Sequence, residues 1–444
     1  MKPGSVAGSG GGATAPAGAR PWRSLRRPFP WLPLILLGLV GLQGCDSLAG
    51  LMGESINVMI VTQRRLDWLR HDDLRHKLWD PLLEEYQNVH PNVRVSLSTV
   101  DENLVVEELK VRTSRGLGPD LLLLRAPMAN TLLKAGLIAP VPQTPAMERT
   151  ISSVDPRFLK RVSQGDRLAG LPLHDLVTLA CFNRQKVPTP PRTTDELMAM
   201  AAAGRAIGLS IDPYGIWWTA GTRGADRAIA PILTGTVPDA SSERGREAEV
   251  ISGWLSWLRG VAQQSRVDIA SGPEDLFNGL VSSRLDWIPC FSLTLAPLRE
   301  AMGPRLGVTS LPSGPGGPPS TFSILQVWSF GLDSSPRQRQ NAADLARLSI
   351  DPMLQRRYVL DSEEVLPVNR FVTTPVASSG VLAALAKAEE QFQSGSPLLT
   401  RPFTTEHLHA VTKLTENLIQ QVMLGVLTPQ EAAAQLLRFG EPLR

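Results

Sequence analysis

Short apolar segments alternate with amphipathic ones in the first part of the chain. The segment SINVMIVT (55–62) is apolar and rich in β-branched residues, which predicts a strand. Leu78, Leu82 and Tyr86 then recur at a spacing of four and predict the apolar face of a helix. Two further strands, each followed by a helix, are predicted before residue 142. This alternation predicts an α/β fold whose strands run mainly parallel.

The middle of the chain continues as a mixture of strands and helices. Thr193 or Thr194 is the expected N-cap of a helix, and the segment SGPGGPPS (313–320) predicts a flexible loop. The last hundred residues are predicted to be mostly helical, with a break at VLPVNR (365–370). The predicted strands of this part are DLVTLACFN (175–183), SSRLDWIPCFSL (282–293) and LGVTSLP (306–312).

A basic and then apolar leader precedes these elements. Residues 31–42 form an apolar run of twelve. A bilayer span needs about 20 residues, so this run fits the core of a signal peptide instead. The following LQGC (42–45) resembles the lipobox of bacterial lipoproteins, which implies that Cys45 carries a lipid and becomes the N-terminus. We therefore expect a lipid-anchored protein on the periplasmic or extracytoplasmic face of the cytoplasmic membrane.

The leader also explains the charge of the chain. The whole sequence has 45 basic and 42 acidic residues, a net charge of +3, and five of the basic residues precede Cys45. The remainder is close to neutral, so its charge gives no indication of a nucleic-acid partner. Cys181 and Cys290 are the other two cysteines. Export permits a disulfide between them, but two buried thiols fit the sequence equally well.

Five segments, in this order, resemble the extracellular solute-binding proteins of bacterial ABC importers, in the sugar-binding group that includes the maltose-binding protein. The resemblance implies a two-lobed periplasmic-binding-protein fold of type II. In this α/β fold each lobe has a mixed, mainly parallel sheet flanked by helices, with a hinge between the lobes and the ligand in the cleft. The segments are YQNVHPNVRVSL (86–97), GLGPDLLLL with LLKAGLIAPV (116–141), LPLHDLVTLACFNRQKV with PPRTTDEL (171–197), VTSLPSGPGG (308–317) and AADLARLSIDPMLQRRYVLDSEEVLPVNRFV (342–372).

The resemblance also implies the division of the chain. We expect a lipoprotein signal peptide with a disordered N-terminal extension over 1–44, and a lipid-anchored linker over 45–54. The N-terminal lobe is expected to consist of 55–174 and 311–366, and the C-terminal lobe of 175–310 and 367–444.

The segment DPYGIWW (212–218) holds the first candidate ligand contacts, because it resembles a sugar-contacting segment of the maltose binder. Sugars present apolar faces that stack on aromatic rings and hydroxyl groups that need donors and acceptors. Asp212 would accept hydroxyl protons, Tyr214 would stack, and Trp217 or Trp218 would add a platform. Alternatively, the adjacent tryptophans point in opposite directions and one belongs to the core.

The segment LDWIPCFS (285–292) resembles a second such segment. Trp287 or Phe291 would be its platform and Asp286 its polar contact, although an aromatic residue on a buried strand is the alternative.

The first lobe departs from the maltose pattern. Where the maltose binder has an Asp-Arg pair after the Pro119-Asp120 strand, this chain has Pro127-Met128. Gln63, Arg64 and Arg125 are the remaining candidate contacts, and a solvated surface charge is the alternative for each arginine.

The expected function is that of a receptor that delivers a small polar ligand, a sugar or sugar-like osmolyte, to the membrane subunits of an ABC permease. We expect a monomer. We expect no catalytic step, because no zinc-type Cys/His spacing, phosphate loop or G-x-S-x-G motif occurs. We also expect no cofactor, no metal and no nucleic acid. One alternative is an exported glycosidase, which would pair Asp212 with Asp175 or Asp286. The other is a binding fold that has lost its ligand and serves as a scaffold.

Overall fold

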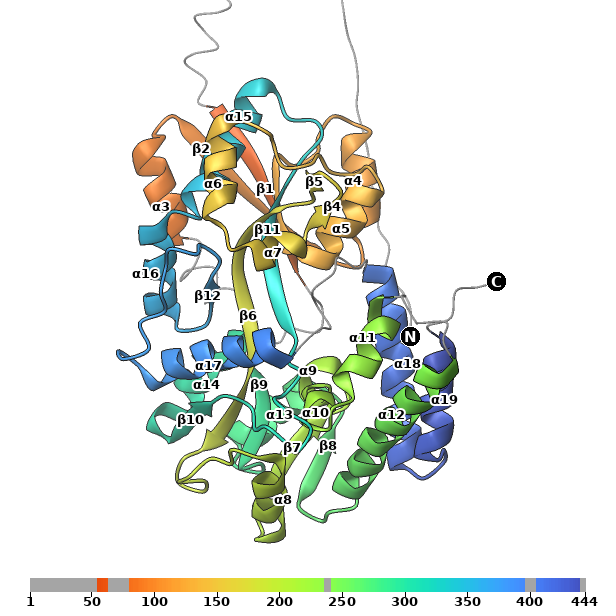
Figure 1. The fold of residues 1–444 in the computed structure, drawn as a ribbon. Helices are drawn as coiled ribbons and strands as arrows, with labels where there is room; N and C mark the ends of the chain where they lie inside the picture. Colours follow the sequence, from red (N-terminus) through yellow and green to blue (C-terminus); the bar gives the residue numbers. More distant parts are fainter. Residues whose placement is uncertain (1–53, 63–79, 235–240, 396–404, 440–444) are drawn as a thin grey trace, which may run out of the picture. The chain divides into compact units, whose positions relative to one another are not determined.

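The structure is a computed structural model that describes residues 54–62, 80–234, 241–395 and 405–439 (Figure 1). These residues belong to one compact unit, 54–444. The leader, Cys45, Gln63 and Arg64 lie outside the described residues. Among the described helices, none combines the length and the apolar character that crossing a membrane requires.

A ten-stranded mixed sheet organises this unit. The strands lie in the order β2-β1-β3-β11-β6-β9-β7-β8, and β10 and β12 also pair with β6. Their bounds are β1 Glu54–Thr62, β2 Val93–Asp101, β3 Leu121–Arg125, β6 Leu171–Asn183, β7 Ile207–Ser210, β8 Val267–Ala270, β9 Trp287–Phe291, β10 Leu306–Thr309, β11 Ser323–Phe330 and β12 Leu366–Pro367. The strand pair β4 (Ser163–Gln164) and β5 (Arg167–Leu168) is separate.

The strands β1, β2, β3, β11 and β12 and the beginning of β6 form the first half of the sheet. β1 pairs in parallel with β2 and β3, which confirms the parallel strands that the alternating pattern predicts. Leu82 and Tyr86 are buried, as the spacing predicts for a helix face. The helices of this half are α3 Asp80–Val89, α4 Val105–Thr113, α5 Ala126–Lys134, α6 Pro145–Ser153, α7 Pro156–Lys160, α15 Pro336–Leu348 and α16 Pro352–Ser362.

The strands β7, β8, β9 and β10 and the end of β6 form the second half of the sheet. β7 pairs in parallel with β8 and β9. Thr193 is the N-cap of α8, where its hydroxyl accepts a hydrogen bond from the Glu196 amide at 3.1 Å. The helical segments are α8 Thr194–Ala202, α9 Pro213–Ile216, α10 Trp218–Thr222, α11 Asp226–Thr234, α12 Ser241–Ala262, α13 Pro273–Val281, η3 Ser292–Thr294, α14 Leu295–Met302, η4 Gly303–Arg305, α17 Gly380–Gly395, α18 Thr405–Met423 and α19 Pro429–Phe439.

Strand β6 runs through both halves of the sheet (Figure 1). All thirteen of its residues are buried. Up to Val177 it pairs with β11 in the first half, and from Thr178 it pairs with β9 in the second. β10 and β11 both run antiparallel to β6, so a second segment of the chain follows the same crossing. The expected lobe boundary after residue 174 lies within β6, and this boundary stays a prediction.

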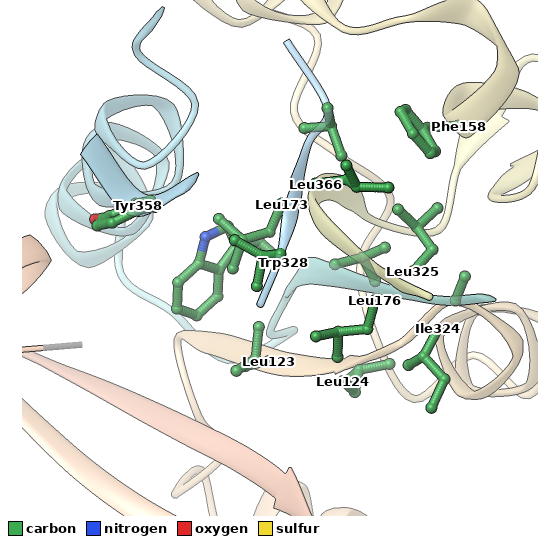
Figure 2. Packing of buried hydrophobic residues seen from close by; sticks show 14 of the residues in the cluster. Leu123, Leu124, Phe158, Leu173, Leu176, Ile324, Leu325, Trp328, Tyr358 and Leu366 are labelled. Atoms are coloured by element: carbon green, nitrogen blue, oxygen red, sulfur yellow. The ribbon is translucent and has the colours of Figure 1, made fainter. Parts of the chain in front are cut away.

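The core of the first half packs against this crossing strand (Figure 2). Trp328 on β11 is buried among Leu173 on β6, Leu123 on β3 and other apolar side chains. Its indole N–H donates a hydrogen bond to the Ser349 hydroxyl at 2.9 Å, which satisfies the one polar group of the ring. Trp328 therefore stabilises the sheet where β11 crosses between its two halves.

The loop SGPGGPPS (313–320) is docked against α10, contrary to the expected flexible loop. The Gly316 amide donates to the Thr222 carbonyl at 2.8 Å, and the Thr194 amide donates to the Ser313 carbonyl at 2.8 Å. A Cβ atom on Gly316 would lie 2.2 Å from the Gly224 amide nitrogen. The glycines therefore allow a close approach of two backbones. From the sequence alone, the same glycines predicted a flexible loop.

Cys181 and Cys290 form a disulfide between the neighbouring strands β6 and β9, with 5.7 Å between their Cα atoms. Of the two alternatives that the sequence left open, the structure has the disulfide. Because antiparallel pairing brings the two cysteines together across 109 residues of chain, the bond encloses β7, β8 and the helices between them in one covalent loop.

Removal of this disulfide is expected to lower the free energy of unfolding by about 4–5 kcal/mol, because a cross-link over so long a loop restricts the unfolded chain. The measurement is urea unfolding of wild type and of the Cys181→Ala, Cys290→Ala double variant. Wild type in reductant is the control and should match the variant. Equal midpoints for wild type and variant, with thiol titration confirming an oxidised wild type, would contradict this prediction.

The crossing also contains a buried histidine. His174 on β6 is 5% exposed and pairs with Gln326 on β11. Burial lowers the pKa of its imidazole from 6.5 to about 4, while the hydrogen bond with Gln326 opposes that shift. In the unfolded chain the same imidazole takes up a proton near its usual pKa. Between pH 6.5 and about pH 4 the unfolded chain therefore binds more protons at this residue than the folded chain does. The stability that neutral His174 contributes is lost as the pH falls through this range.

We expect the free energy of unfolding to fall between pH 7 and 5 with a contribution from His174 of up to about 1.4 kcal/mol per pH unit. Urea unfolding at several pH values should give a smaller slope for His174→Gln than for wild type. Gln340→Ala, which changes an exposed and uncharged residue on α15, should keep the wild-type slope. The same slope for His174→Gln and wild type would contradict the assignment.

Candidate functional site

A cavity of about 650 Å³ lies where β7 and β8 end. Ile211 and Asp212, which follow β7, form one side of it. The segment from Ser271 to Asp275, which follows β8 and begins α13, forms a second side. The third side is α18, through Lys413, Glu416, Asn417 and Gln420.

Strand direction explains why these segments meet. β7 and β8 are parallel, so their carboxyl ends lie at the same edge of the sheet, where ligands of open α/β sheets bind. Gly272 is the N-cap of α13 and Pro273 occupies its first turn, so the helix begins directly at this edge. The α18 residues lie at spacings of three and four, which places them on one polar helix face.

Asp212 is the sequence-predicted contact that lines this cavity. Its residue is 5% exposed, and the Ser210 hydroxyl donates a hydrogen bond to its carboxylate. The Asp212 carbonyl accepts the Gly215 amide at 3.0 Å, and a Cβ atom on Gly215 would lie 1.8 Å from the Ser210 hydroxyl oxygen. Gly215 therefore permits the tight turn that holds the Asp212 carboxylate at the strand end.

The tryptophans lie in two different apolar cores. Trp217 packs against Phe322, with ring centroids 5.3 Å apart. Trp218 packs near Trp287 at 6.2 Å in another core, and its indole donates to the Gly215 carbonyl at 3.1 Å. All three tryptophans are at most 1% exposed. Burial of such large rings stabilises the fold by about 2–3 kcal/mol each, and in this structure no ring face is open to a ligand. The side chain of Tyr214 lies outside the described residues.

Asp286 lies directly before β9, and Phe291 is the last residue of this strand. The Asp286 carboxylate accepts the Ala206 amide at 3.0 Å, and its carbonyl accepts the Asn183 amide at 2.9 Å. Asp286 thus fixes the beginning of the strand. Phe291 is 8% exposed and lines, together with Asp212, a second cavity of only about 30 Å³. Of these two candidates, the structure brings Phe291 near Asp212.

Arg125 forms an ion pair at the end of β3. Its Nε atom lies 3.1 Å from a carboxylate oxygen of Glu102, the residue after β2, and a guanidinium nitrogen also contacts this carboxylate. Both side chains are less than a fifth exposed. Arg125 is therefore a paired and mostly buried group. It does not line the cavity described above.

The α18 residues and the beginning of α13 were not predicted as a site from the sequence. The spacing of Lys413, Glu416, Asn417 and Gln420 was the available signal, but a polar helix face most often faces water alone. Within the described part of the chain, no group of three or more His, Cys, Asp or Glu side chains could hold a metal ion.

No family model matches the amino-acid sequence of the chain. The alignment with the light-independent protochlorophyllide reductase subunit N of Heliobacterium modesticaldum extends over 241 residues, which are 49% of this chain. The two sequences are 27% identical over these residues. The chain spans about half, 51%, of the length of this curated relative.

Solved structures resemble the chain over most of its length. The maltotriose-binding protein of Thermus thermophilus, bound with maltotriose, matches 87% of this chain and 98% of its own with a TM-score of 0.64 and 18% identity. The GacH receptor of Streptomyces glaucescens, solved unliganded and with acarbose, matches 87% and 97% with a TM-score of 0.62 and 14% identity. An ABC transporter solute-binding protein of Thermotoga lettingae, bound with α-D-tagatose, matches 87% and 100% with a TM-score of 0.61 and 15% identity.

The fold expected from the sequence is therefore confirmed: the chain has the α/β fold of the two-lobed periplasmic binding proteins of type II.

Proposed function

We propose that this protein is a lipid-anchored extracytoplasmic receptor that binds a small polar ligand, a sugar or sugar-like osmolyte, and delivers it to an ABC permease. The cavity at the carboxyl ends of β7 and β8 is the observation on which the proposal rests. Its volume of about 650 Å³ accommodates a small solute, and its lining supplies donors and acceptors for hydroxyl groups. The receptor is monomeric and works without catalysis in this proposal.

The fold supports the same conclusion. The three proteins of this fold named above were solved with maltotriose, acarbose and tagatose. A strand shared by two halves of a sheet is also suited to hinge closure, which a ligand drives by making better contacts in the closed form.

The alternatives have less support. The glycosidase alternative pairs Asp212 with Asp175 or Asp286. Asp175 is buried in an ion pair with Arg161 at 3.2 Å, and Asp286 accepts the Ala206 amide; neither lines the cavity with Asp212. The scaffold alternative expects a cleft that side chains fill, whereas a cavity is open here.

Ligand binding is the first prediction of this proposal. A matching sugar or polyol at a hundredfold excess over its dissociation constant should stabilise the full chain by about 2.7 kcal/mol, which a thermal melting series detects. Asn417→Ala should weaken that binding by about three- to tenfold, because one neutral hydrogen bond contributes about 0.5–1.5 kcal/mol. Gln340→Ala, on the exposed face of α15, is the matched control and should bind like wild type.

A ligand that is recovered chemically intact supports the receptor, and one that is consumed supports the enzyme. Unchanged affinity in Asn417→Ala would remove the cavity from the proposed site. Absence of a thermal shift over a panel of sugars, glycosides and polyols would favour the scaffold.

Lipid attachment is the second prediction. LQGC (42–45) makes Cys45 the acceptor, so labelled palmitate fed to expressing bacteria should appear in wild type and be lost in Cys45→Ser. The Cys181→Ala, Cys290→Ala double variant is the control that keeps Cys45 and should keep the label. Label retained by Cys45→Ser would contradict the anchoring proposal.

A further inference from the structure

One edge of the sheet receives the chain that follows Cys45. β1 begins at Glu54 and runs parallel to β2 and β3, so the amino ends of these three strands lie at this edge. α15 begins beside them, because the Arg337 guanidinium lies 3.1 Å from the Glu54 carboxylate. A Cβ atom on Gly118, before β3, would lie 2.7 Å from an Asp333 carboxylate oxygen, after β11. The surface formed by residues 89–94, 115–118 and 332–339 is the entry edge.

Positive charge predominates at the entry edge. Among its described residues and the adjoining Glu54 and Asp120, four guanidinium groups stand against three carboxylates. Asp120 is buried, Glu54 is half-buried in its ion pair, and of the three carboxylates only that of Asp333 is exposed. All four arginines are exposed, and only one of them forms an ion pair in the described part of the chain. They are Arg94, Arg115, Arg337 and Arg339.

Large apolar side chains are exposed at the same edge. Leu117 is 67% exposed, Val89 61% and Leu332 40%. Leu117 directly precedes Gly118 and Leu332 directly precedes Asp333, so these two leucines belong to segments that contact each other. A surface that lies on an anionic bilayer combines such residues, because apolar side chains enter the interface while basic groups meet the negative lipids.

The length of chain between the anchor and the sheet selects this surface. Eight residues, 46–53, separate Cys45 from Glu54. A polypeptide extends by at most about 3.6 Å per residue, so a lipid on Cys45 holds Glu54 within about 32 Å of the bilayer surface. Figure 1 shows α15 and the start of β1 at one end of the described unit and α8 at the other. The end that carries the entry edge is therefore the one that the anchor keeps near the membrane.

We propose that the entry edge is a docking surface for the anionic bilayer that holds the lipid anchor. The inference rests on the lipid attachment in the proposed function and adds which side of the protein faces the membrane. The guanidinium groups meet the lipid phosphates, and Leu117 and Leu332 enter the interface. Each arginine close to an anionic surface strengthens the association by about fivefold, and salt weakens it.

Quenchers carried by lipid headgroups can identify the side that faces the membrane. The full chain is expressed in bacteria, purified from their membranes in detergent and reconstituted into vesicles of phosphatidylethanolamine and phosphatidylglycerol. A fluorophore is attached to one added cysteine at an exposed position, in Ser114→Cys beside the entry edge or in Ala203→Cys at the end of α8. Nitroxide headgroups should quench the label at position 114 at least about threefold more than the label at position 203.

Lipid charge and salt should both change this difference. It should shrink in vesicles of phosphatidylcholine alone, because these carry no net negative charge. It should also shrink as NaCl rises from about 50 mM to about 500 mM, because salt screens exposed charges.

Matched charge variants assign the docking to the arginines. Arg94→Gln combined with Arg115→Gln should lower the difference between the two labels by about twofold or more. Arg205→Gln combined with Arg266→Gln removes the same charge from exposed positions before β7 and β8, and should keep the wild-type difference. Melting curves of each variant establish that it is folded.

The outcomes separate docking from lipid attachment. Equal quenching of the two labels on protein that floats with the vesicles overturns the docking surface and leaves the anchor in place. A difference that persists in the Arg94→Gln, Arg115→Gln variant, or that the control variant loses as well, also overturns it. Protein that neither floats with the vesicles nor carries labelled palmitate counts against the anchor, and the docking inference falls with it.

Discussion

The whole arrangement depends on one strand that both halves of the sheet share. β6 is buried along its entire length and changes partners from β11 to β9 between Val177 and Thr178. Backbone hydrogen bonds on both sides leave it no freedom to move without its neighbours. The two halves are therefore joined in one sheet, and one cluster of buried apolar side chains includes residues of both halves.

A buried polar cluster reinforces this crossing. The Arg161 guanidinium lies 3.2 Å from the Asp175 carboxylate and 2.9 Å from the Ser323 hydroxyl, so it joins β6 and β11. Burial raises the pKa of the Asp175 carboxyl, and Arg161 opposes that rise. Loss of either partner would leave an uncompensated buried charge, which costs more than the pair itself stabilises. The cluster therefore favours one alignment of the two strands over others.

Apolar and polar side chains of the second half occupy different positions relative to the sheet. The large aromatic rings of the second half fill two cores beside the sheet, and this fixes where β7 and β9 lie. The strand ends are then free to present polar groups, and Gly215 allows the turn that directs Asp212 to the cavity. The described residues that line the cavity include carboxylates, amides and a hydroxyl, whereas Trp217, Trp218 and Trp287 are buried behind the strand ends.

The sequence by itself determined the fold, because the alternation of strands and helices is a local property and five ordered segments resemble one family. The resemblance of DPYGIWW to a sugar-contacting segment also predicted Asp212 as a contact, and Asp212 lines the cavity. Only the tertiary structure decided that Trp217 and Trp218 face different cores, that Arg125 pairs with Glu102, and that Cys181 meets Cys290. It also brought α18 to the strand ends from some 200 residues away. The physical reason is range: periodicity reports which face of an element is buried, whereas contacts between distant segments depend on how the elements pack.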